Sequence, residues 1–509
     1  MLIEIVLIVV TFIAWGYYWV KKTYSFFDGK NIEHDKPYPI IGSMKEVLMK
    51  KVNFLDMIVI LYQKFNSSIV GIYDTKTPMY LIRNPEVLRQ IAIKDFDHFM
   101  NHRTFFDDGG GLFENSLFSM QNQKWKDMRS NLSPAYTGSK LRTMFEFIRE
   151  TAETSVQNLK TEKDNGIVDI ELKDYFRRYA NDIIATAAFG FQIDSMKDKE
   201  NQFFKMGQEV TNFSTLGALK FFCMSNFKTV SKFLNLKFIS EKQSQYYKHL
   251  VLGAMKNRLE KKIFRPDIIN ILMETTGMSI NGKSEHVHGS KWTDNEIVAQ
   301  CFTLFFAGFE SVSSALCIIA HELMENQEIQ EKLREEIEEV VTSLNGGNLT
   351  YEALSGMKYM DSVISEALRK WPLTPTTDRV CTKAINIQDP DTGEYIHIKP
   401  GDNIMIPIVG LQRDPKYFPD PLKFDPERFT DENKKNIFPN TYLPFGVGPR
   451  MCIGMRFALL EIKAIVFYLF NQLRLEAAEK SCVPLKLDPC SILMQPKNGF
   501  WVKLVDNEK

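Results

Sequence analysis

The stretch Phe445-Gly446-Val447-Gly448-Pro449-Arg450-Met451-Cys452-Ile453-Gly454 decides the fold and the chemistry of this chain. It places Cys452 inside a glycine-rich loop, and a helical pattern over Met455–Phe470 follows at once. At the start of a helix, free backbone N–H groups and the helix dipole lower the pKa of a thiol. The glycines would let the backbone approach a flat cofactor closely. A buried cysteine in an ordinary turn is the alternative interpretation.

The composition describes a large globular protein without net charge. The chain has 509 residues, of which 44% are hydrophobic, and this is enough to bury a sizeable core. It carries 63 basic and 63 acidic residues, so its charge gives no reason to expect a nucleic-acid partner. The seven cysteines form no CxxC pair, which argues against a disulfide framework or structural zinc and favours a reducing compartment.

The first twenty residues, Met1–Val20, are apolar apart from Glu4 and predict a transmembrane anchor. Twenty helical residues span about 30 Å, the thickness of the hydrocarbon core of a bilayer. Lys21 and Lys22 follow, and the positive-inside rule puts them in the cytosol. A cleaved signal peptide is the alternative, although a basic start and a small-residue cleavage site are missing. We expect an anchor over 1–20, a basic and proline-rich linker over 21–43, and one domain over 44–509.

The body of the chain predicts a mainly α fold with small β-sheets. Apolar residues recur at helical spacing over Asp174–Phe191 and Ile329–Val341, and Asn84-Pro85 is a cap for a further helix over Val87–Ile93. Short alternating stretches and one turn predict the small sheets, namely Ile69–Tyr73, Met79–Ile82, Tyr395–Ile398 and the turn Asp389–Gly393. Residues 276–292 predict a polar loop, and a metal role for its His286 and His288 is the minor interpretation.

The segment Ile297–Ala320 has one charge, Glu310, in 24 residues, and by hydropathy it could cross a membrane. We predict instead a long helix buried in the core. Thr293 and Glu296 form a capping box at its start, and no basic residues flank it as topology signals. A charge in the middle of such a helix is costly and usually functional in either environment.

With four further motifs, the Cys452 loop resembles the haem-binding loop of the cytochrome P-450 superfamily. It matches F-x-x-G-x-R-x-C-x-G at every fixed position. The other motifs follow the order of the family, namely Trp125 and Arg129 in W-x-x-x-R, Ala307–Ser311 in A-G-x-[DE]-T, Glu366–Arg369 in E-x-x-R and Phe424–Phe429 in the P-E-R-F segment. Ser311 departs from the threonine of the family and keeps only its hydroxyl. The whole chain is most similar to animal microsomal members, above all the insect groups that metabolise drugs and toxins.

The resemblance implies the cytochrome P-450 fold, with a helix-rich lobe, a smaller β-rich lobe and haem between them. It implies that Cys452 binds the haem iron and that Glu310 and Ser311 relay protons. The cofactor-binding residues that it implies are Trp125, Arg129, Ala307, Arg379, Phe445 and Arg450, with His102 or Arg103 as a further propionate partner. It also implies a buried network of Glu366, Arg369 and Arg428 that supports folding rather than catalysis.

The function implied by the resemblance is a monooxygenase that inserts one oxygen atom of O₂ into a lipophilic small molecule. The cofactor is haem b, and NADPH supplies electrons indirectly through NADPH-cytochrome P-450 reductase, with a b-type cytochrome as a further candidate partner. A basic patch for the acidic reductase is expected, comprising Lys124, Lys126, Arg428, Lys434, Lys435, Arg450 and Lys463. The expected location is the endoplasmic reticulum membrane with the catalytic domain in the cytosol, and the expected role is xenobiotic detoxification.

Three alternatives stay open at this point. The first is turnover or biosynthesis of an endogenous lipid or hormone by the same reaction. The second is a haem sensor or electron carrier, and the third is an isomerase of the same fold that rearranges peroxides without a reductase. The neighbouring acid and alcohol, Glu310 and Ser311, argue against the last two, because neither needs a proton relay over an open iron position.

Overall fold

The computed structural model describes residues 2–104, 111–211, 215–265, 267–275, 292–491 and 493–507. The chain forms two compact units. The first comprises residues 1–103, 374–421 and 438–451, and the second comprises 104–373, 422–437 and 452–509. The predicted loop with His286 and His288 lies outside the described residues.

The first unit begins with α1 (Leu2–Thr23), an apolar helix. Its most apolar window is 0% buried, so α1 has the length and the exposure of a membrane anchor. The remaining elements of the unit are α2 (Lys45–Leu48), α3 (Phe54–Gln63), β1 (Ile69–Asp74), β2 (Thr77–Ile82), α4 (Pro85–Arg89), η1 (Gln90–Lys94), η2 (Phe96–His98), β4 (Thr377–Val380), β5 (Ile385–Gln388), β6 (Tyr395–Ile398), β7 (Asn403–Ile406), α17 (Ile408–Gln412) and η7 (Gly448–Arg450).

Four strands form the larger sheet of this unit in the order β1-β2-β7-β4. The β2–β7 pair is parallel and the β4–β7 pair is antiparallel, with Arg379 opposite Ile404. The hairpin β5–β6 is separate and turns through Asp389–Gly393, as the sequence predicts. In that turn the Asp389 carboxylate accepts hydrogen bonds from the Asp391 amide and the Thr392 hydroxyl.

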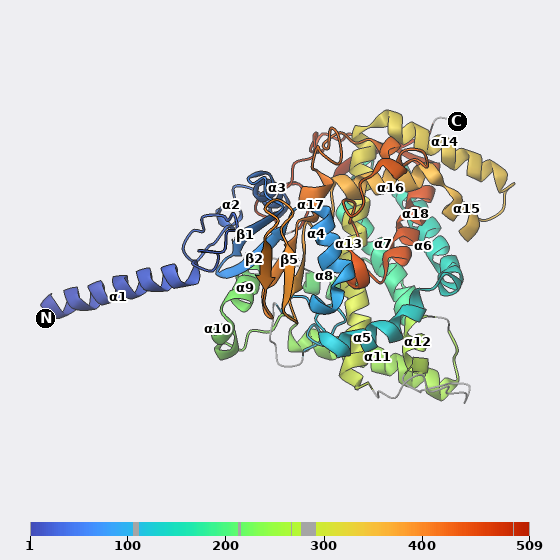
Figure 1. Cartoon of the computed structure of the whole chain (residues 1–509). Coiled ribbons are helices and arrows are strands. Elements are labelled where there is room, and N and C mark those ends of the chain that lie inside the picture. The colour runs from blue at the N-terminus through green and yellow to red at the C-terminus, as the bar shows by residue number, and fades with distance from the viewer. Residues whose placement is uncertain are drawn as a thin grey trace. The chain divides into compact units, whose positions relative to one another are not determined.

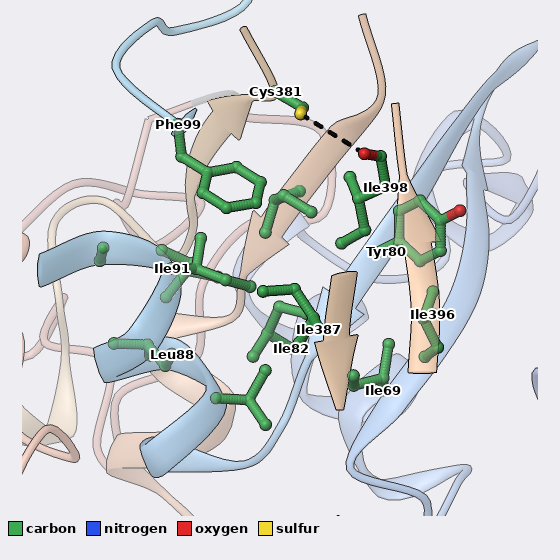
Figure 2. Packing of buried hydrophobic residues seen from close by; sticks show 14 of the residues in the cluster. Ile69, Tyr80, Ile82, Leu88, Ile91, Phe99, Cys381, Ile387, Ile396 and Ile398 are labelled. Carbon is green, nitrogen blue, oxygen red and sulfur yellow. Dashed lines mark hydrogen bonds between the residues drawn. The ribbon is translucent and has the colours of Figure 1, made fainter. Parts of the chain in front are cut away.

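The core of the first unit lies where this hairpin packs against the helical turn after Asn84-Pro85 (Figure 2). The Asn84 side chain caps α4 by accepting from the amides of Glu86 and Val87, which confirms the predicted cap. Ile82, Ile91 and Ile387 are fully buried and point toward one another in Figure 2. This packing fixes η1, which contacts η7 in the cysteine loop.

The second unit is mainly helical. Its elements are α5 (Asn122–Leu132), η3 (Ser133–Tyr136), α6 (Gly138–Asp164), β3 (Asp169–Glu171), α7 (Leu172–Ile184), η4 (Ala185–Phe189), α8 (Gln202–Thr211), α9 (Thr215–Asn226), α10 (Lys228–Phe233), α11 (Glu241–Lys261), α12 (Ile268–Thr275), α13 (Asp294–Glu325), α14 (Gln327–Ser343), α15 (Tyr351–Gly356), α16 (Lys358–Lys370), η5 (Pro426–Phe429), η6 (Lys434–Asn436), α18 (Met455–Gln472), β8 (Leu473–Glu476) and β9 (Trp501–Asp506). The strands β3, β9 and β8 form a three-stranded sheet.

The long helix α13 lies in the core of the second unit, beside α7 (Figure 1). Its most apolar window is 61% buried. Thr293 and Glu296 form the predicted capping box, and the helix continues to Glu325, further than the apolar pattern indicates. The helix predicted over Asp174–Phe191 is regular only as far as Ile184, the last residue of α7. The π-helical segment η4 follows, and Gly190 ends it with φ +75°.

A buried ion network joins α16 to the segment that contains η5. Glu366 and Arg369 are both 0% exposed, and the Arg369 Nε and Nη2 atoms lie 2.7 and 2.8 Å from the two Glu366 oxygens. Arg428 Nε lies 3.5 Å from Glu366 Oε1, which also accepts from the Asp425 amide. The network that the resemblance implies is therefore confirmed. The helix α16 ends at Lys370, before Trp371 and Pro372.

We expect Arg369→Leu to lower the free energy of unfolding by about 3–5 kcal/mol, because it leaves the Glu366 carboxylate buried without its closest counter-charge. The matched control is Glu352→Gln, which breaks the exposed pair of Arg142 and Glu352 at 2.9 Å and should leave stability unchanged. Urea unfolding of both variants checks this. Equal effects of the two substitutions would contradict the role given to the buried network.

Candidate active site

Cys452 is the first residue of the last segment of the second unit and lies three residues before α18. Its side chain is accessible in the protein, yet the thiol lies deep enough that burial raises its pKa above the ordinary value. The Gly454 N–H and the Arg129 guanidinium act in the opposite direction but do not outweigh burial. The helix start lowers this pKa as predicted, but burial outweighs it. A bound metal cation would select the thiolate directly.

The glycines of the loop have roles that differ from one another. Gly446 and Gly448 both have positive φ, at +78° and +70°. A Cβ on Gly448 would lie 2.0 Å from the Ala92 carbonyl oxygen, so this glycine permits close packing of the loop on η1. Gly454 has φ −87°, and a Cβ there would meet Tyr136 at an ordinary 3.8 Å. Approach to a flat cofactor is thus only part of what the glycines provide.

The helix α5 brings Trp125 and Arg129 to one face, four residues apart. Trp125 is 3% exposed, and burial lowers the pKa of Arg129 while the charges of Cys452 and Tyr136 raise it. Arg129 therefore lies close enough to Cys452 for each to influence the other. The second unit thus brings together the cysteine and the W-x-x-x-R pair that the sequence predicts.

In the first unit, Arg379 lies against the loop that leads to the cysteine. Its side chain is 1% exposed, and its two Nη atoms donate to the carbonyl oxygens of Val447 (2.9 Å) and Asp378 (2.6 Å). Burial lowers the pKa of Arg379 to about 10. Its buried Nε has no hydrogen-bond partner among the described residues. Arg450, three residues after Val447, donates from Nε to the Met100 carbonyl at 2.8 Å.

His102 and Arg103 are engaged within the first unit. His102 Nδ1 lies 3.1 Å from Asp378 Oδ1, and burial lowers the pKa of the ring although Asp378 opposes this. The ring is therefore neutral at pH 7, and its Nδ1–H donates to Asp378. Arg103 donates to Asp378 from its amide and pairs with Asp74 at 2.7 Å. These contacts favour a supporting role for both residues beside Arg379.

The middle of α13 carries an accessible stripe on an otherwise buried helix. Ala307 and Ser311 are exposed, and Thr303 on the preceding turn is half-buried. Because these positions are four residues apart, they lie on one face of the helix. The Ser311 hydroxyl donates to the Ala307 carbonyl at 2.5 Å, and the Thr303 hydroxyl makes the same type of bond to Ala299 at 2.6 Å. Ser311 keeps its lone pairs to accept a further hydrogen bond.

Glu310 has different partners from Ser311, although the two are adjacent in sequence. Its Oε1 atom lies 2.7 Å from Lys173 Nζ, and its Oε2 atom lies 2.9 Å from Arg177 Nη2. Lys173 also donates to the Ser314 hydroxyl at 2.5 Å. The sequence analysis missed Lys173 and Arg177. The sequence signal that could have found them is a pair of basic residues four positions apart on α7, a helix whose other residues are largely buried.

The basic patch expected for a redox partner is smaller than the sequence suggests. Lys463 is 6% exposed and donates to Asp361 at 2.9 Å, and Arg428 faces Glu366. These two residues were wrongly included as surface cations. Lys124 is exposed but pairs with Glu296 at 2.7 Å. Lys435 is exposed on η6, and the part of the predicted patch on the second unit's surface therefore consists of Lys124, Lys126, Lys434 and Lys435.

Within each unit, the side chains suit a flat acidic cofactor that carries a metal. The second unit offers an accessible thiol at a helix start and an accessible stripe on α13. The first unit offers Arg379, whose buried Nε is a donor without a partner among the described residues. Guanidinium groups suit carboxylates, and a thiolate suits iron or another soft cation. The thiol at the helix start is the feature by which the class of haem-thiolate proteins holds its iron.

Comparison with known proteins agrees with this class. The family model described as cytochrome P450 matches residues 33–502. The chain is 46% identical to "Probable cytochrome P450 9f2" of Drosophila melanogaster over 96% of both chains, and 39% identical to "Cytochrome P450 9e2" of Blattella germanica over 94% of both. It is 31% identical to "Lithocholate 6-beta-hydroxylase" of Mesocricetus auratus over 96% of this chain and 95% of that protein.

The chain belongs to the cytochrome P450 family. It is therefore an oxidoreductase of the monooxygenase type, and its family implies haem-thiolate iron. The apolar helix α1 fits the membrane association of animal members. The mainly α fold with small sheets, expected from the sequence, is confirmed.

We expect Lys173→Met and Glu310→Gln to be strongly coupled. Either substitution alone leaves a poorly compensated charge among largely buried groups, whereas the double variant removes both charges. The double variant should be more stable than the sum of the single effects predicts, by about 1–3 kcal/mol. Urea unfolding of all four proteins measures this coupling. The exposed pair of Lys332 and Glu427, tested in the same way, should show far weaker coupling. Simple additivity at Lys173 and Glu310 would contradict the contact.

Proposed function

We propose that this chain is a membrane-anchored haem-thiolate monooxygenase that oxidises lipophilic small molecules. The observation that carries the proposal is Cys452 at the start of α18, inside a complete F-x-x-G-x-R-x-C-x-G loop. We further propose that NADPH-cytochrome P-450 reductase supplies the electrons, with a b-type cytochrome as a second candidate donor. The proposed location is the endoplasmic reticulum membrane with the catalytic domain in the cytosol, which the apolar α1 and the following Lys21 and Lys22 support.

In this proposal, the residues that would hold the haem are those that match the motifs of the family. Cys452 would supply the thiolate to the haem iron, and Phe445 belongs to the loop that carries it. Trp125, Arg129, Arg379 and Arg450 would hold the propionates, because charge-assisted bonds to carboxylates are strong and geometrically defined. Ala307 has the smallest side chain on the accessible stripe of α13, and it would leave room for the flat ring. The bound haem supplies oxygen activation, which a thiolate ligand promotes.

Glu310 and Ser311 are the proposed proton relay. Ser311 is accessible and can accept a hydrogen bond, while Glu310 is held by Lys173 and Arg177 on α7. For Glu310 to pass a proton toward Ser311, its carboxyl group must leave at least one of these cations. The free energy of the ion pairs therefore sets the cost of moving the Glu310 carboxyl group. Ser311 takes part in the relay without having to move.

The substrate side of the second unit is aromatic. Phe113, Phe238 and Phe306 form a mutual cluster with ring centroids 5.1–6.1 Å apart, and Phe302 stacks near Phe306 at 6.0 Å. Such a lining suits an apolar ligand, which supports lipophilic substrates. The insect relatives support detoxification of xenobiotics as the role. The similarity to a lithocholate hydroxylase favours a second candidate, the hydroxylation of an endogenous sterol-like lipid.

The purified full-length chain, combined with reductase and a lipophilic substrate, should consume NADPH and O₂. Its reduced carbon monoxide complex should show the long-wavelength absorption band of thiolate-bound haem. Cys452→Ser should abolish this band and the consumption, because an alcohol does not replace the thiolate. Cys490→Ser, which changes an exposed cysteine, is the matched control and should alter neither. A haem sensor or a peroxide isomerase would show no reductase-dependent consumption, and that result would reject the proposal.

We expect Ser311→Ala to raise the amount of hydrogen peroxide released per NADPH consumed, because the relay loses the hydroxyl beside the reacting oxygen. Thr303→Ala is the matched control, since its hydroxyl makes the same back-bond two turns earlier on the same stripe. A peroxide assay beside an NADPH assay measures the coupling. If both alanine variants behave like the wild type, Ser311 has no relay role.

A further inference from the structure

The proposed mechanism leaves one buried acid of the second unit without a role. Glu461 lies on α18, nine residues after Cys452, and its side chain is 0% exposed. Neither of its carboxyl oxygens has a hydrogen-bond partner among the residues that the structure describes. The Tyr179 hydroxyl lies nearby but donates to the backbone carbonyl of Glu461 at 2.8 Å. This differs from Glu310 and Glu366, which both face cations.

Burial raises the pKa of Glu461 well above its ordinary value, and no other cause acts on it. Two phenols, Tyr136 and Tyr179, feel its charge, and both have pKa values raised chiefly by burial. The buried charged groups on the elements that pack against α18 have their own partners. These are Arg149 of α6 with Glu146 and Glu153, His321 of α13 with Glu325, Arg334 of α14 with Glu331, and Arg474 of β8 with Glu476, while Lys463 of α18 itself pairs with Asp361.

A carboxyl group in this position holds its proton at neutral pH and would carry an unscreened negative charge once it lost the proton. Cys452 lies three residues before α18, and the helix rise of 1.5 Å per residue puts Glu461 about 9 Å along the axis from Met455, the first residue of that helix. Tyr136 feels the charges of both Cys452 and Glu461, so one phenol lies within electrostatic reach of both groups.

We propose that Glu461 is a redox-linked acid, which holds its proton more tightly when the iron bound at Cys452 has gained an electron. This rests on the proposed haem-thiolate function. In the alkaline range where Glu461 is ionised, transfer of one electron from the reductase to the bound iron would be accompanied by uptake of one proton from solvent by the Glu461 carboxylate. No bond to substrate forms or breaks. Glu461 is thus a positioning residue that acts on the site through its charge.

The linkage has a definite sign. Where Glu461 is ionised in the ferric protein, reduction takes up a proton, so a higher pH disfavours reduction. The reduction potential of the wild type should therefore fall as the pH rises from neutral to moderately alkaline. In Glu461→Gln the amide is neutral at every pH and has nearly the same shape, so this fall should disappear. At neutral pH the two proteins should have similar potentials.

The test is a spectroscopic potential titration of the full-length haem-loaded protein across this pH range. Wild type, Glu461→Gln, Glu461→Asp and Glu335→Gln are compared. Glu335 is an exposed acid on α14, and its substitution should keep the wild-type pH dependence. Glu461→Asp retains an acid and should also keep a pH-dependent potential. A potential that is independent of pH in the wild type, or a slope that persists in Glu461→Gln, would overturn the inference.

Stability gives a second readout that does not involve electron transfer. Because the folded-state pKa of Glu461 is raised, the folded chain retains a proton that the unfolded chain has released. This contribution to the free energy of unfolding is full below the unfolded pKa and is lost as the pH rises toward the folded value. Glu461→Gln should remove that loss and gain stability relative to wild type as the pH rises. The opposite trend would overturn the inference.

The two proposals fail in different ways. If the wild-type carbon monoxide complex lacks the thiolate band, the haem-thiolate function itself is wrong. If the band is present in wild type and in Glu461→Gln, but their potentials respond to pH in the same way, only the role of Glu461 is wrong. If Glu461→Gln does not load haem, the other three proteins still test the role of Glu461. Glu461→Asp should shift the pH range over which the reduction potential falls, whereas Glu335→Gln should keep the wild-type range.

Discussion

The buried Glu366 carboxylate is the constraint on which the second unit depends. A carboxylate with no exposed surface is tolerated only if cations and N–H groups surround it, and Arg369, Arg428 and the Asp425 amide do so. These contacts fix α16 to the segment containing η5. The end of α16 is tied in turn to α13, since Lys370 and the Trp371 indole both bond to buried Glu322. The helix that carries the accessible stripe is thereby held in place.

The same principle operates differently at Glu310 and at Glu461. Glu310 pairs with two cations on α7, Lys173 and Arg177. The accessible stripe of α13 lies beside these ion pairs. A carboxylate in this position can exchange partners at moderate cost, as a proton relay requires. Glu461 has no hydrogen-bond partner for its carboxyl oxygens among the described residues, and burial raises its pKa. Glu366 and Glu310 thus each face two cations, whereas the carboxyl group of Glu461 stays protonated because no such partner compensates its burial.

The cysteine is governed by competing effects. The helix start and Arg129 favour the thiolate, whereas burial favours the thiol and prevails in the protein by itself. In the first unit, burial likewise lowers the pKa of Arg379 to about 10, although the guanidinium remains charged at neutral pH. A metal cation would offset the burial cost of the Cys452 thiolate, and a carboxylate would offset that of the Arg379 guanidinium. The physical chemistry of each unit is therefore consistent with the cofactor that the family implies.

The sequence by itself determined the family, the apolar helix α1 and the capping box of α13, because each depends on residues at fixed spacing or on local hydrogen bonding, and the resemblance implied the Glu366 network. The sequence also indicated the cysteine and the arginines, although it did not show that burial outweighs the helix start at the thiol and it placed Lys463 on the surface. Only the tertiary structure revealed Lys173 and Arg177 as partners of Glu310, and only it showed that the Glu461 carboxyl group has no hydrogen-bond partner among the described residues. Such pairings join helices far apart in the chain, and burial depends on everything packed around a residue, so neither is encoded in any local pattern.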